Sequence, residues 1–585
     1  MPVFSKPVVH TPRGAFRWMH DFLHADVMKS ATALIERRLT ALSLTTAFSG
    51  VCCPSSALHC LVAGFGRDAA SRMVLDYHNS VEWDTECNYE LSSLSVPPAC
   101  QHEDITSFLT STTRELIAEL GDNPAKHKLE WIIMQRSGAV TTTAACRCHP
   151  DDTFCSYKWS WIHIAGPPCV DWSSNGLCQG LSGPTTVHLL SWLALVRLVR
   201  PYIIICENVV KWPHNYVHSW LAPVGYSMRT CILNSTMFAF PVERNRRYTV
   251  FTLDMCVTLP RPLSGRNGIE SILGRDIGDS HSYLQYLIAP ASELDCELMW
   301  ASTRDDSPTA TPLKSSDPRA FERSLTGYER KHLGGFREIQ RGVAYTLSVN
   351  PADRVSKGKP TILHTLTAGQ HLVWVDGNGF DRWVSGRELL AFQGLPTYLE
   401  WLDAICPGDP IPCYSFNYSR MRLGLPPRRR RHMTMQSGNG MHVAMVGAVI
   451  LWCLRFVESA PSRIPPCVAM CICDDADDDR PQLDSFDVAF LRLSSKRQRA
   501  RSSRSSVVSD AISVSGSVTS SCLSNSHASM AAVAIAVSDS DIIAPGSHGS
   551  VHVPPAVLCE SSVNTSAISF DDMFSRGVRR KKLRV

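Results

Sequence analysis

The sequence has little net charge, no regular cysteine spacing and no internal repeat. Its 585 residues carry a formal net charge of only +4, so binding to a polyanion would depend on local basic patches rather than on an overall field. The 22 cysteines follow no disulfide-type pattern, which favours a reducing compartment with mostly reduced thiols. A hydrophobic content of 44% with 19% charged residues indicates a globular protein with a substantial core.

The sequence also shows no apolar segment that is typical of a signal peptide or of a membrane span. The first stretch, MPVFSKPVVHTPRGAFRW, has no apolar core, so we expect no signal peptide. The most apolar run, Met441–Phe456, is shorter than the ~20 residues that a membrane span needs. It also contains His442 and Arg455. We therefore predict a buried helix and no membrane partner.

The patterning along the chain predicts an α/β fold followed by less regular segments. From Leu42 to about Leu253, short apolar runs alternate with helical patterns, which is typical of a parallel sheet. Residues from 255 to about 345 lose this rhythm and are rich in Pro, Ser and Asp, which indicates a second domain or a large insertion. Beyond about Ala460 the chain is Ser-rich with charged blocks, and it is predicted to be disordered.

The first motif with chemical meaning is LTTAFSGVCCPSS, which is interpreted as a strand, a tight turn and a helix. Phe48, Ser49 and Gly50 end the strand. Turns of this type bind nucleotide-like cofactors in α/β folds, although an ordinary turn explains the pattern equally well. Glu86 in VEWDTECNYEL is predicted to end a second strand and to accept from ribose hydroxyls. Asp104 in HEDITSF is a candidate acceptor for an exocyclic amine.

The second motif places Cys169 on a corner stiffened by proline, in WIHIAGPPC. The prolines fix the backbone, and a nucleophile gains from a preset position. A lone cysteine is more often a small buried apolar residue. Glu207, however, ends the apolar strand in RPYIIICENVV, and the carboxyl ends of parallel strands line one crevice. A thiol that attacks a ring carbon and an acid that protonates a ring nitrogen form a coherent pair.

In this order the motifs resemble those of the cytosine-5 DNA methyltransferases. FSGVCCP is similar to their first motif, which holds the methionine part of S-adenosyl-L-methionine, and GPPCVDWSSNG to their catalytic loop. ENV, from Glu207, is similar to the motif whose glutamate contacts cytosine, and PVERNRRYTVF to Gln-x-Arg-x-Arg, with Arg244 and Arg246 at the arginines. RWVSGRELLAFQGLP resembles the motif that ends the target-recognition region, and QSGNGMHVAMVGAVI resembles the last motif. The resemblance spans roughly Leu42 to Phe456.

The resemblance implies a Rossmann-like methyltransferase sheet with a smaller, irregular target-recognition domain. Its parts are the catalytic domain (41–254), the target-recognition domain (255–435) and a helix that completes the catalytic domain (436–458). The patterning outside this span predicts an N-terminal extension with an amphipathic helix (1–40) and a disordered, Ser-rich C-terminal tail (459–585).

The implied activity is transfer of a methyl group from S-adenosyl-L-methionine to C5 of cytosine in double-stranded DNA, with the base flipped out of the duplex. Cys169 would attack C6, and Glu207 would hold and protonate N3. Arg246 and Arg244 would anchor the base or its phosphate and order the catalytic loop. No metal is assigned. The implied cofactor contacts are Phe48, Ser49, Gly50, Glu86, Asp104, Ile105, Pro168 and Asn439.

Three positions depart from the family pattern. Cys52 stands where the family has a second glycine in the cofactor turn, Val242 replaces the glutamine before the arginines, and Val170 follows the nucleophile where glutamine is common. Two alternatives stay open: a tRNA cytosine-5 methyltransferase, and a degenerate homologue that binds DNA as a scaffold. The tRNA-modifying branch has a short Cys-Phe-Thr signature that is absent from this sequence.

Other clusters give weaker signals. Cys146, Cys148, His149 and Cys155 are zinc-capable residue types without a standard finger spacing, and Cys467–Cys473 is a weaker case of the same kind. Arg428–Arg431 is either a solvated run or a phosphate contact. Basic clusters in the tail, KRQRAR and RRKKLR, together with the DNA substrate predict a nuclear protein, with protein partners unknown.

Overall fold

The computed structural model describes residues 6–460 with gaps, all of them within one compact unit of the chain. The predicted tail from 461 onward, with its cysteines and basic clusters, lies outside the described residues. The internal gaps are 52, 74, 95, 122–123, 149–153, 175, 303–312, 318, 340–341, 348–360, 377–379 and 406–426.

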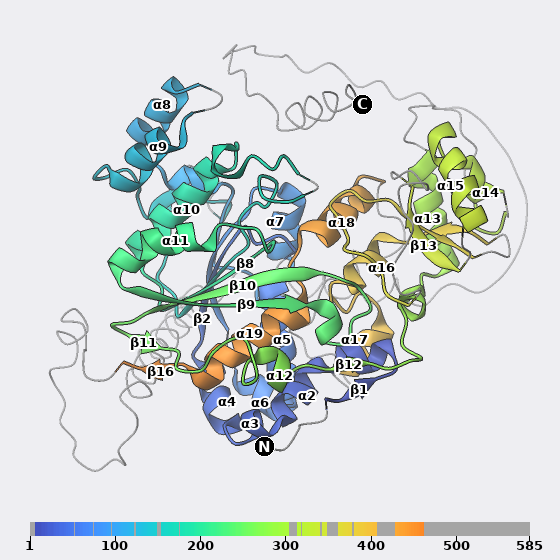
Figure 1. The fold of residues 1–585 in the computed structure, drawn as a ribbon, viewed down its shortest axis with the longest axis horizontal. Coiled ribbons are helices and arrows are strands. Elements are labelled where there is room, and N and C mark those ends of the chain that lie inside the picture. The colour runs from blue at the N-terminus through green and yellow to red at the C-terminus, as the bar shows by residue number, and fades with distance from the viewer. Residues whose placement is uncertain are drawn as a thin grey trace, which may run out of the picture. The chain divides into compact units, whose positions relative to one another are not determined.

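A single large sheet organises the described part of the chain. Its seven strands lie in the order β4-β3-β2-β7-β8-β10-β9 (Figure 1). The first five strands in this order run parallel to one another, and β10 is antiparallel to both β8 and β9. The predicted α/β class with a mostly parallel sheet is confirmed. The strands are β2 (Ser43–Ala47), β3 (Asp76–Val81), β4 (Cys100–His102), β7 (Ile162–Ala165), β8 (Ile203–Asn208), β9 (Tyr226–Asn234) and β10 (Asn245–Leu253).

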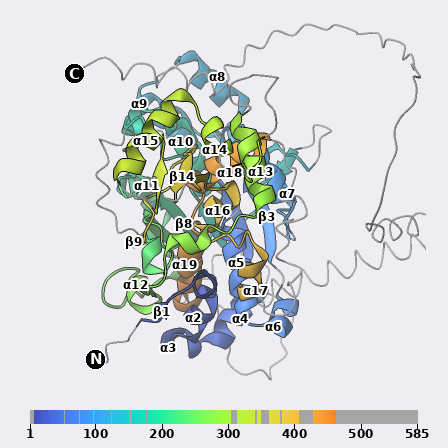
Figure 2. The ribbon, with the colours of Figure 1, turned by 90° about the vertical axis from the view of Figure 1, so that its right-hand side faces the viewer.

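Helices cover both faces of this sheet, which explains why the central strands β2, β7 and β8 are buried along their whole length rather than at alternate residues. In β8, all six residues are buried. One face packs against α5 (Cys53–Gly64) and α19 (Val443–Phe456), and the other against α10 (Thr186–Val199) and α11 (His214–Leu221) (Figures 1 and 2).

Helix α19 is the apolar run predicted to be a buried helix, and this prediction is confirmed. Every residue of α19 except Arg455 is buried. No single helix in the described ranges is long and apolar enough to cross a membrane; Met433–Asn439 and Val443–Phe456 pass that test only as a pair, with a bend of 42° between them.

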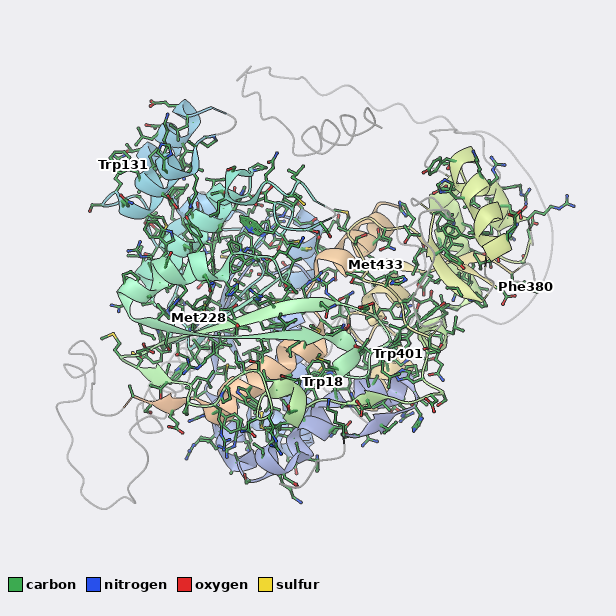
Figure 3. All side chains as sticks on the ribbon, viewed as in Figure 1. Trp18, Trp131, Met228, Phe380, Trp401 and Met433 are labelled. Atoms are coloured by element: carbon green, nitrogen blue, oxygen red, sulfur yellow. The ribbon has the colours of Figure 1, made fainter. Side chains whose placement is uncertain are left out.

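The N-terminal segment expected as an extension is instead part of the main core. Helix α2 (Trp18–His24) packs against α5 and α19, and α4 (Thr32–Thr40) packs against α19. Helix α1 (Pro12–Phe16) packs against α17 (Leu399–Ile405), and α3 (Asp26–Lys29) packs against α2. Trp18, labelled in Figure 3, is fully buried, and a Cβ added at Gly447 of α19 would overlap its ring. An amphipathic pattern alone could not tell a packed helix from an appended one, since both present one apolar face.

A smaller domain with its own core lies within the region predicted for target recognition. Its helices are α13 (Ala291–Ser302), α14 (Ala320–Arg323) and α15 (Gly327–Ile339), beside the antiparallel sheet β13-β14-β15. Phe321, Phe336 and Trp383 are central to this second core. The strands are β13 (Val343–Thr346), β14 (Leu372–Val375) and β15 (Arg382–Trp383).

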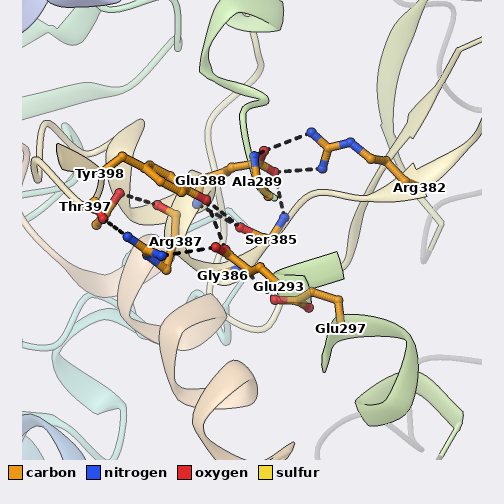
Figure 4. Close-up of polar contacts among 10 residues, drawn as sticks. All are labelled: Ala289, Glu293, Glu297, Arg382, Ser385, Gly386, Arg387, Glu388, Thr397 and Tyr398. Carbon is orange, nitrogen blue, oxygen red and sulfur yellow. Dashed lines mark hydrogen bonds and ion pairs between the residues drawn. The ribbon is translucent and has the colours of Figure 1, made fainter. Parts of the chain in front are cut away.

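A buried polar network joins this domain to helix α16 (Gly386–Ala391), as Figure 4 shows. Ser385 and Glu388 form a capping box at the start of α16. The fully buried Glu388 carboxylate pairs with both terminal nitrogens of Arg382, at 2.9 and 2.8 Å, and accepts from the Ala289 amide at 2.8 Å. A paired, hydrogen-bonded charge is the form in which a carboxylate can be buried, so this junction has one defined geometry.

The remaining elements connect these parts. They are β1 (Val8–Val9), α6 (Arg67–Arg72), α7 (Thr85–Ser92), η1 (Ile105–Phe108), α8 (Ser111–Glu119), α9 (Lys126–Leu129), η2 (Glu130–Gln135), β5 (Thr143–Ala145), β6 (Phe154–Ser156), η3 (Gly180–Ser182), η4 (Ala222–Val224), η5 (Ser235–Met237), β11 (Val257–Thr258), α12 (Ile269–Ile272), β12 (Asp276–Ile277), η6 (Tyr283–Tyr286), α17 (Leu399–Ile405), α18 (Pro427–Asn439) and β16 (Glu458–Ser459).

Candidate active site

The carboxyl ends of the parallel strands bring the candidate residues to one edge of the sheet. A side chain added at Gly166, after β7, would lie 3.7 Å from Glu207 Oε2 at the end of β8. It would also lie 3.8 Å from the carbonyl oxygen of Phe48, after β2. The catalytic and the cofactor motifs therefore meet around Gly166, as expected for this class of sheet.

The turn after β2 has the backbone geometry of a close-approach site. Phe48 and Gly50 both have left-handed backbone angles, with φ of 54° and 52°. No atom lies within 4 Å of the position that a Cβ of Gly50 would take. The Ser49 hydroxyl is held within the turn by Thr46 Oγ1 at 2.6 Å. Cys52, the unusual residue of this turn, lies outside the described residues.

The acidic residue at the end of the second strand is Glu82. Strand β3 ends at Val81, so the prediction that Glu86 ends this strand is wrong. Glu86 lies in the first turn of α7, which Asp84 caps. The signal available in the sequence was VEWD, where Glu82 directly follows Val81 at the end of the strand, whereas Glu86 follows a helix cap.

Glu82 is buried and hydrogen-bonds to the turn that follows β2. Its Oε2 accepts from the amide of Gly50 at 2.7 Å, and its Oε1 accepts from the amide of Asp84 at 3.0 Å. Burial raises the pKa of the Glu82 carboxyl to about 7, and these amides oppose that rise. Next to it, Trp83 leaves 59% of its surface exposed, which is unusual for a large aromatic side chain.

Asp104 follows β4, one strand further along the same edge. Its carboxylate accepts from the amide and the hydroxyl of Thr106 at 2.9 and 2.6 Å, and it caps η1. Ile105 is buried beneath it. These neighbouring strand ends fit a nucleoside-containing cofactor. They offer an open turn, a buried carboxylate, an exposed aromatic ring and a second carboxylate.

Cys169 lies half-buried in the loop after β7, beside Pro168. The amides of Trp172 and Ser173 donate to the Cys169 carbonyl oxygen at 3.0 and 2.8 Å, which folds the loop back at once. Burial raises the pKa of the Cys169 thiol, while the nearby charge of Arg246 opposes that rise. The resting thiol therefore keeps its proton and needs to lose it as it attacks.

Asp171 braces this loop, although no motif in the sequence marks this residue. The buried carboxylate accepts from both the amide and the hydroxyl of Thr185, and its backbone carbonyl accepts from Gly180 at 2.9 Å. A side chain at Gly183 would overlap the Asp171 carboxylate. The loop between Cys169 and Thr185 is consequently closed around one buried acid.

Glu207 and Arg246 form the charged centre of the site. Glu207 Oε1 lies 3.1 Å from Arg246 Nε, and both side chains are largely buried. The register of β8 and β10 produces this contact, since Glu207 lies opposite Tyr248 and residues two apart share a face of the sheet. Asn208 donates to the Pro167 carbonyl at 2.8 Å and thereby ties the end of β8 to the cysteine loop.

Arg244 differs from its predicted role. Its fully buried guanidinium donates to the carbonyls of Gly438 (3.1 and 3.2 Å) and Gly440 (2.6 Å). Burial lowers the pKa of Arg244 to about 10, and the like charge of Arg246 acts in the same direction. Arg244 therefore positions the turn before α19, and the expectation that it meets the base or its phosphate is corrected.

That turn carries Asn439, a predicted cofactor contact, which is exposed at the end of α18. A side chain at Gly440 would lie 3.5 Å from Val51 and 3.6 Å from Cys53, so the last motif does pack beside the first. Val242, at the family's glutamine position, is buried in the main core. The side chains of Arg428–Arg431 lie outside the described residues, although their backbone belongs to α18.

Comparison with known proteins identifies one segment of the chain. The profile of the family "C-5 cytosine-specific DNA methylase" matches residues 161–258. This segment contains Cys169, Glu207, Arg244 and Arg246, whereas the candidate cofactor residues other than Pro168 lie outside it. The resemblance inferred from the motifs is thereby confirmed.

Individual relatives align over part or most of the chain. The type II methyltransferase M.MthTI of Methanothermobacter thermautotrophicus is 27% identical over 122 residues, which are 19% of this chain and 37% of that protein. The match thus spans little more than a third of the relative's length. The Dnmt2 methyltransferase of S. pombe aligns with a TM-score of 0.38 and 15% identity, over 70% of this chain and 97% of its own. A putative DNA modification methyltransferase from an E. coli prophage aligns with a TM-score of 0.38 and 14% identity, over 71% and 99%.

Proposed function

We propose that this chain, whose residues 161–258 match the profile of the C-5 cytosine-specific DNA methylases, methylates C5 of cytosine in double-stranded DNA, using S-adenosyl-L-methionine. The observation that carries this proposal is the meeting of Cys169, Glu207 and Arg246 at neighbouring strand ends within the matched segment. A thiol, a carboxyl and a guanidinium at one edge supply the groups that attack on a pyrimidine ring requires.

The residues along the first three strand ends fit the cofactor. S-adenosyl-L-methionine, when bound, supplies an electrophilic methyl group. The Glu82 carboxylate would accept from its ribose hydroxyls, and Asp104 would accept from its adenine amine. The exposed ring of Trp83 offers an apolar face for the adenine. Gly50 leaves room for close approach of the backbone, since nothing lies within 4 Å of its Cβ position.

The reaction proposed for the protein's own groups begins with the base flipped out of the duplex into the site. Cys169 Sγ forms a bond to C6 as the thiol proton passes to solvent water, and Glu207 delivers a proton to N3. C5 then forms a bond to the methyl carbon that S-adenosyl-L-methionine would supply, and the bond from that carbon to sulfur breaks to leave S-adenosyl-L-homocysteine. Solvent water accepts the C5 proton, the S–C6 bond breaks to release the Cys169 thiolate, and the N3 proton returns to Glu207. Arg246 holds the Glu207 carboxyl in one orientation throughout.

Two features support a working enzyme over a scaffold. Val242, which replaces a family glutamine, is packed in the core, and the catalytic loop is braced instead by Asp171 and Asn208. Each charged group that the mechanism uses is present and within reach of a partner. We further propose a nuclear location, because a DNA substrate and the two basic clusters of the tail are consistent with it.

The covalent step provides the test. Full-length protein is incubated with S-adenosyl-L-methionine and with duplex DNA or tRNA that contains 5-fluorocytosine, whose C5 cannot lose a proton. We expect an adduct with DNA that survives denaturing electrophoresis. Cys169→Ser should form no adduct, while Cys256→Ser, a half-buried cysteine of the same matched segment, should form it as the wild type does.

The other outcomes are equally informative. An adduct with tRNA and none with DNA would refute the substrate while keeping the nucleophile. DNA binding without an adduct in the wild type, over a range of cytosine contexts, would support the scaffold. An adduct that persists in Cys169→Ser would show that another residue is the nucleophile.

A further inference from the structure

Four cysteines from two separate segments meet at the β4 edge of the large sheet. Cys100 begins β4, Cys146 and Cys148 follow β5, and Cys155 lies in β6. The sulfur atoms of Cys100, Cys148 and Cys155 all lie within 4.8 Å of one another. Cys146 Sγ lies 2.7 Å from Cys148 Sγ and 3.0 Å from Cys155 Sγ.

We propose that Cys100, Cys146, Cys148 and Cys155 form a structural zinc site. Zinc binds four thiolates tetrahedrally at about 2.3 Å, which places the sulfur atoms about 3.8 Å apart. The Sγ atoms of Cys148 and Cys155 are already 3.8 Å apart. The two shorter contacts of Cys146 need to open by about 1 Å to reach that spacing. Such a shift is within the reach of rotation about the cysteine side-chain bonds.

Hydrogen bonds that do not involve the thiols hold β4, with Cys100, next to the β5–β6 segment, with the other three cysteines. The Arg147 amide, between two of the cysteines, donates to the Gln101 carbonyl at 2.8 Å. His102 Nδ1 lies 3.0 Å from the Ala145 carbonyl oxygen. The β5–β6 hairpin is therefore fixed against β4, so a cation would find its ligands already gathered.

A centre of four thiolates and a divalent cation carries a net charge of −2, and the cationic Arg147 lies directly between two of its ligands in the sequence. The Arg147 guanidinium pairs at 2.8 Å with Glu103, which directly follows the strand that supplies Cys100. Four thiolates leave no open position, which makes the site structural rather than catalytic.

The ligand set differs from the one that spacing suggests. The sequence places His149 beside Cys146, Cys148 and Cys155, and His149 lies outside the described residues. Cys100 is about 45 residues earlier in the chain, and only the packing of the hairpin on β4 brings it to the cluster. The site lies four residues before Asp104, so the cation would fix the sheet edge that ends at the cofactor motif.

Metal content of the full chain, purified under a reductant that does not bind zinc, tests the site without reference to activity. We expect about one zinc per chain in the wild type and below about a tenth in Cys100→Ser and Cys155→Ser. Cys296→Ser, a half-buried cysteine of the small domain, should keep the full amount. Cobalt in place of zinc should give thiolate-to-metal charge-transfer bands in the wild type that both variants lose.

A conservative variant guards against simple misfolding. Cys148 is exposed, so Cys148→His should retain the metal because histidine is also a zinc ligand, whereas Cys148→Ala should lose it. Zinc that persists in Cys100→Ser but disappears in His149→Ala would overturn the ligand set. A wild type without zinc and without cobalt–thiolate bands would overturn the proposal, as would a Cys146–Cys155 disulfide that survives the reductant.

Discussion

The affinity of the protein for its cofactor is predicted to rise about tenfold between pH 6 and pH 8, through the ionisation of Glu82. Burial raises the pKa of this carboxyl from its ordinary 4.5 to about 7. The carboxyl is therefore about one-tenth ionised at pH 6 and about nine-tenths ionised at pH 8. Both oxygens already accept from backbone amides, so only the ionised form has acceptor capacity left for two ribose hydroxyls.

The assay is calorimetric titration of the full-length protein with S-adenosyl-L-homocysteine, the stable demethylated product, at several pH values. Histidines titrate in the same range, so the matched control is Glu82→Gln, which has no ionisable group at this position. The variant should bind more weakly at pH 8 and should show little pH dependence. A wild-type affinity that changes less than twofold, or a Glu82→Gln variant that keeps the full slope, would refute the reasoning.

The raised pKa of Glu82 also determines how the stability of the folded protein changes with pH. Because the folded-state pKa of Glu82 is raised, its contribution favours the folded protein fully below pH 4.5 and is lost as the pH rises through about 7. A shift of this size corresponds to about 3 kcal/mol across that window. Bound cofactor should offset part of this loss, so the melting temperature should gain more from the ligand at pH 8 than at pH 6.

Three further substitutions test individual contacts. Gly447→Ala should lower the free energy of unfolding by about 1–3 kcal/mol, because the added methyl overlaps the ring of Trp18. This loss should exceed the helix-propensity gain of about 1 kcal/mol. Urea denaturation measures the free energy of unfolding, and a more stable variant would contradict the packing. Arg244→Lys, which loses one of two carbonyl contacts, should weaken cofactor binding with about 1–3 kcal/mol of lost stability, and a change confined to kcat would contradict its positioning role. Asp171→Ala, which removes the acceptor for both Thr185 hydrogen bonds, should lower kcat about tenfold or more with unchanged cofactor affinity. Methyl transfer and calorimetry measure the two quantities, and an unchanged kcat would show that the loop does not need this brace.

The features that the sequence predicted well are those that local pattern determines. The alternation of buried strands with helices predicted the sheet, and the order of short motifs located Cys169 and Glu207 at strand ends. The buried helix near the end of the described chain followed from its length and its unbroken apolar character. Each of these features depends on residues that are close together in the chain, so the local sequence pattern is sufficient to predict it.

The features that were missed depend on contacts between distant segments. Glu82 and Glu86 lie four residues apart, and only the true end of β3 separates the two candidates. Arg244 resembled a substrate contact until the fold placed the Gly438 carbonyl against it. The fourth cysteine of the cluster, Cys100, joins it through a hairpin that packs on the sheet edge, and no spacing rule encodes that packing.

The place of α19 in the chain has a consequence for synthesis on the ribosome. The sheet is complete in the chain at Leu253, but α19, one of the two helices that pack on the same face, ends at Phe456, about 200 residues later. At about 5–20 residues per second, the ribosome needs roughly 10–40 s to supply that helix. During this interval the apolar surface that α5 shares with α19 has no cover. Nascent chains stalled before α19 should therefore recruit chaperones, and release from them should coincide with the emergence of this helix.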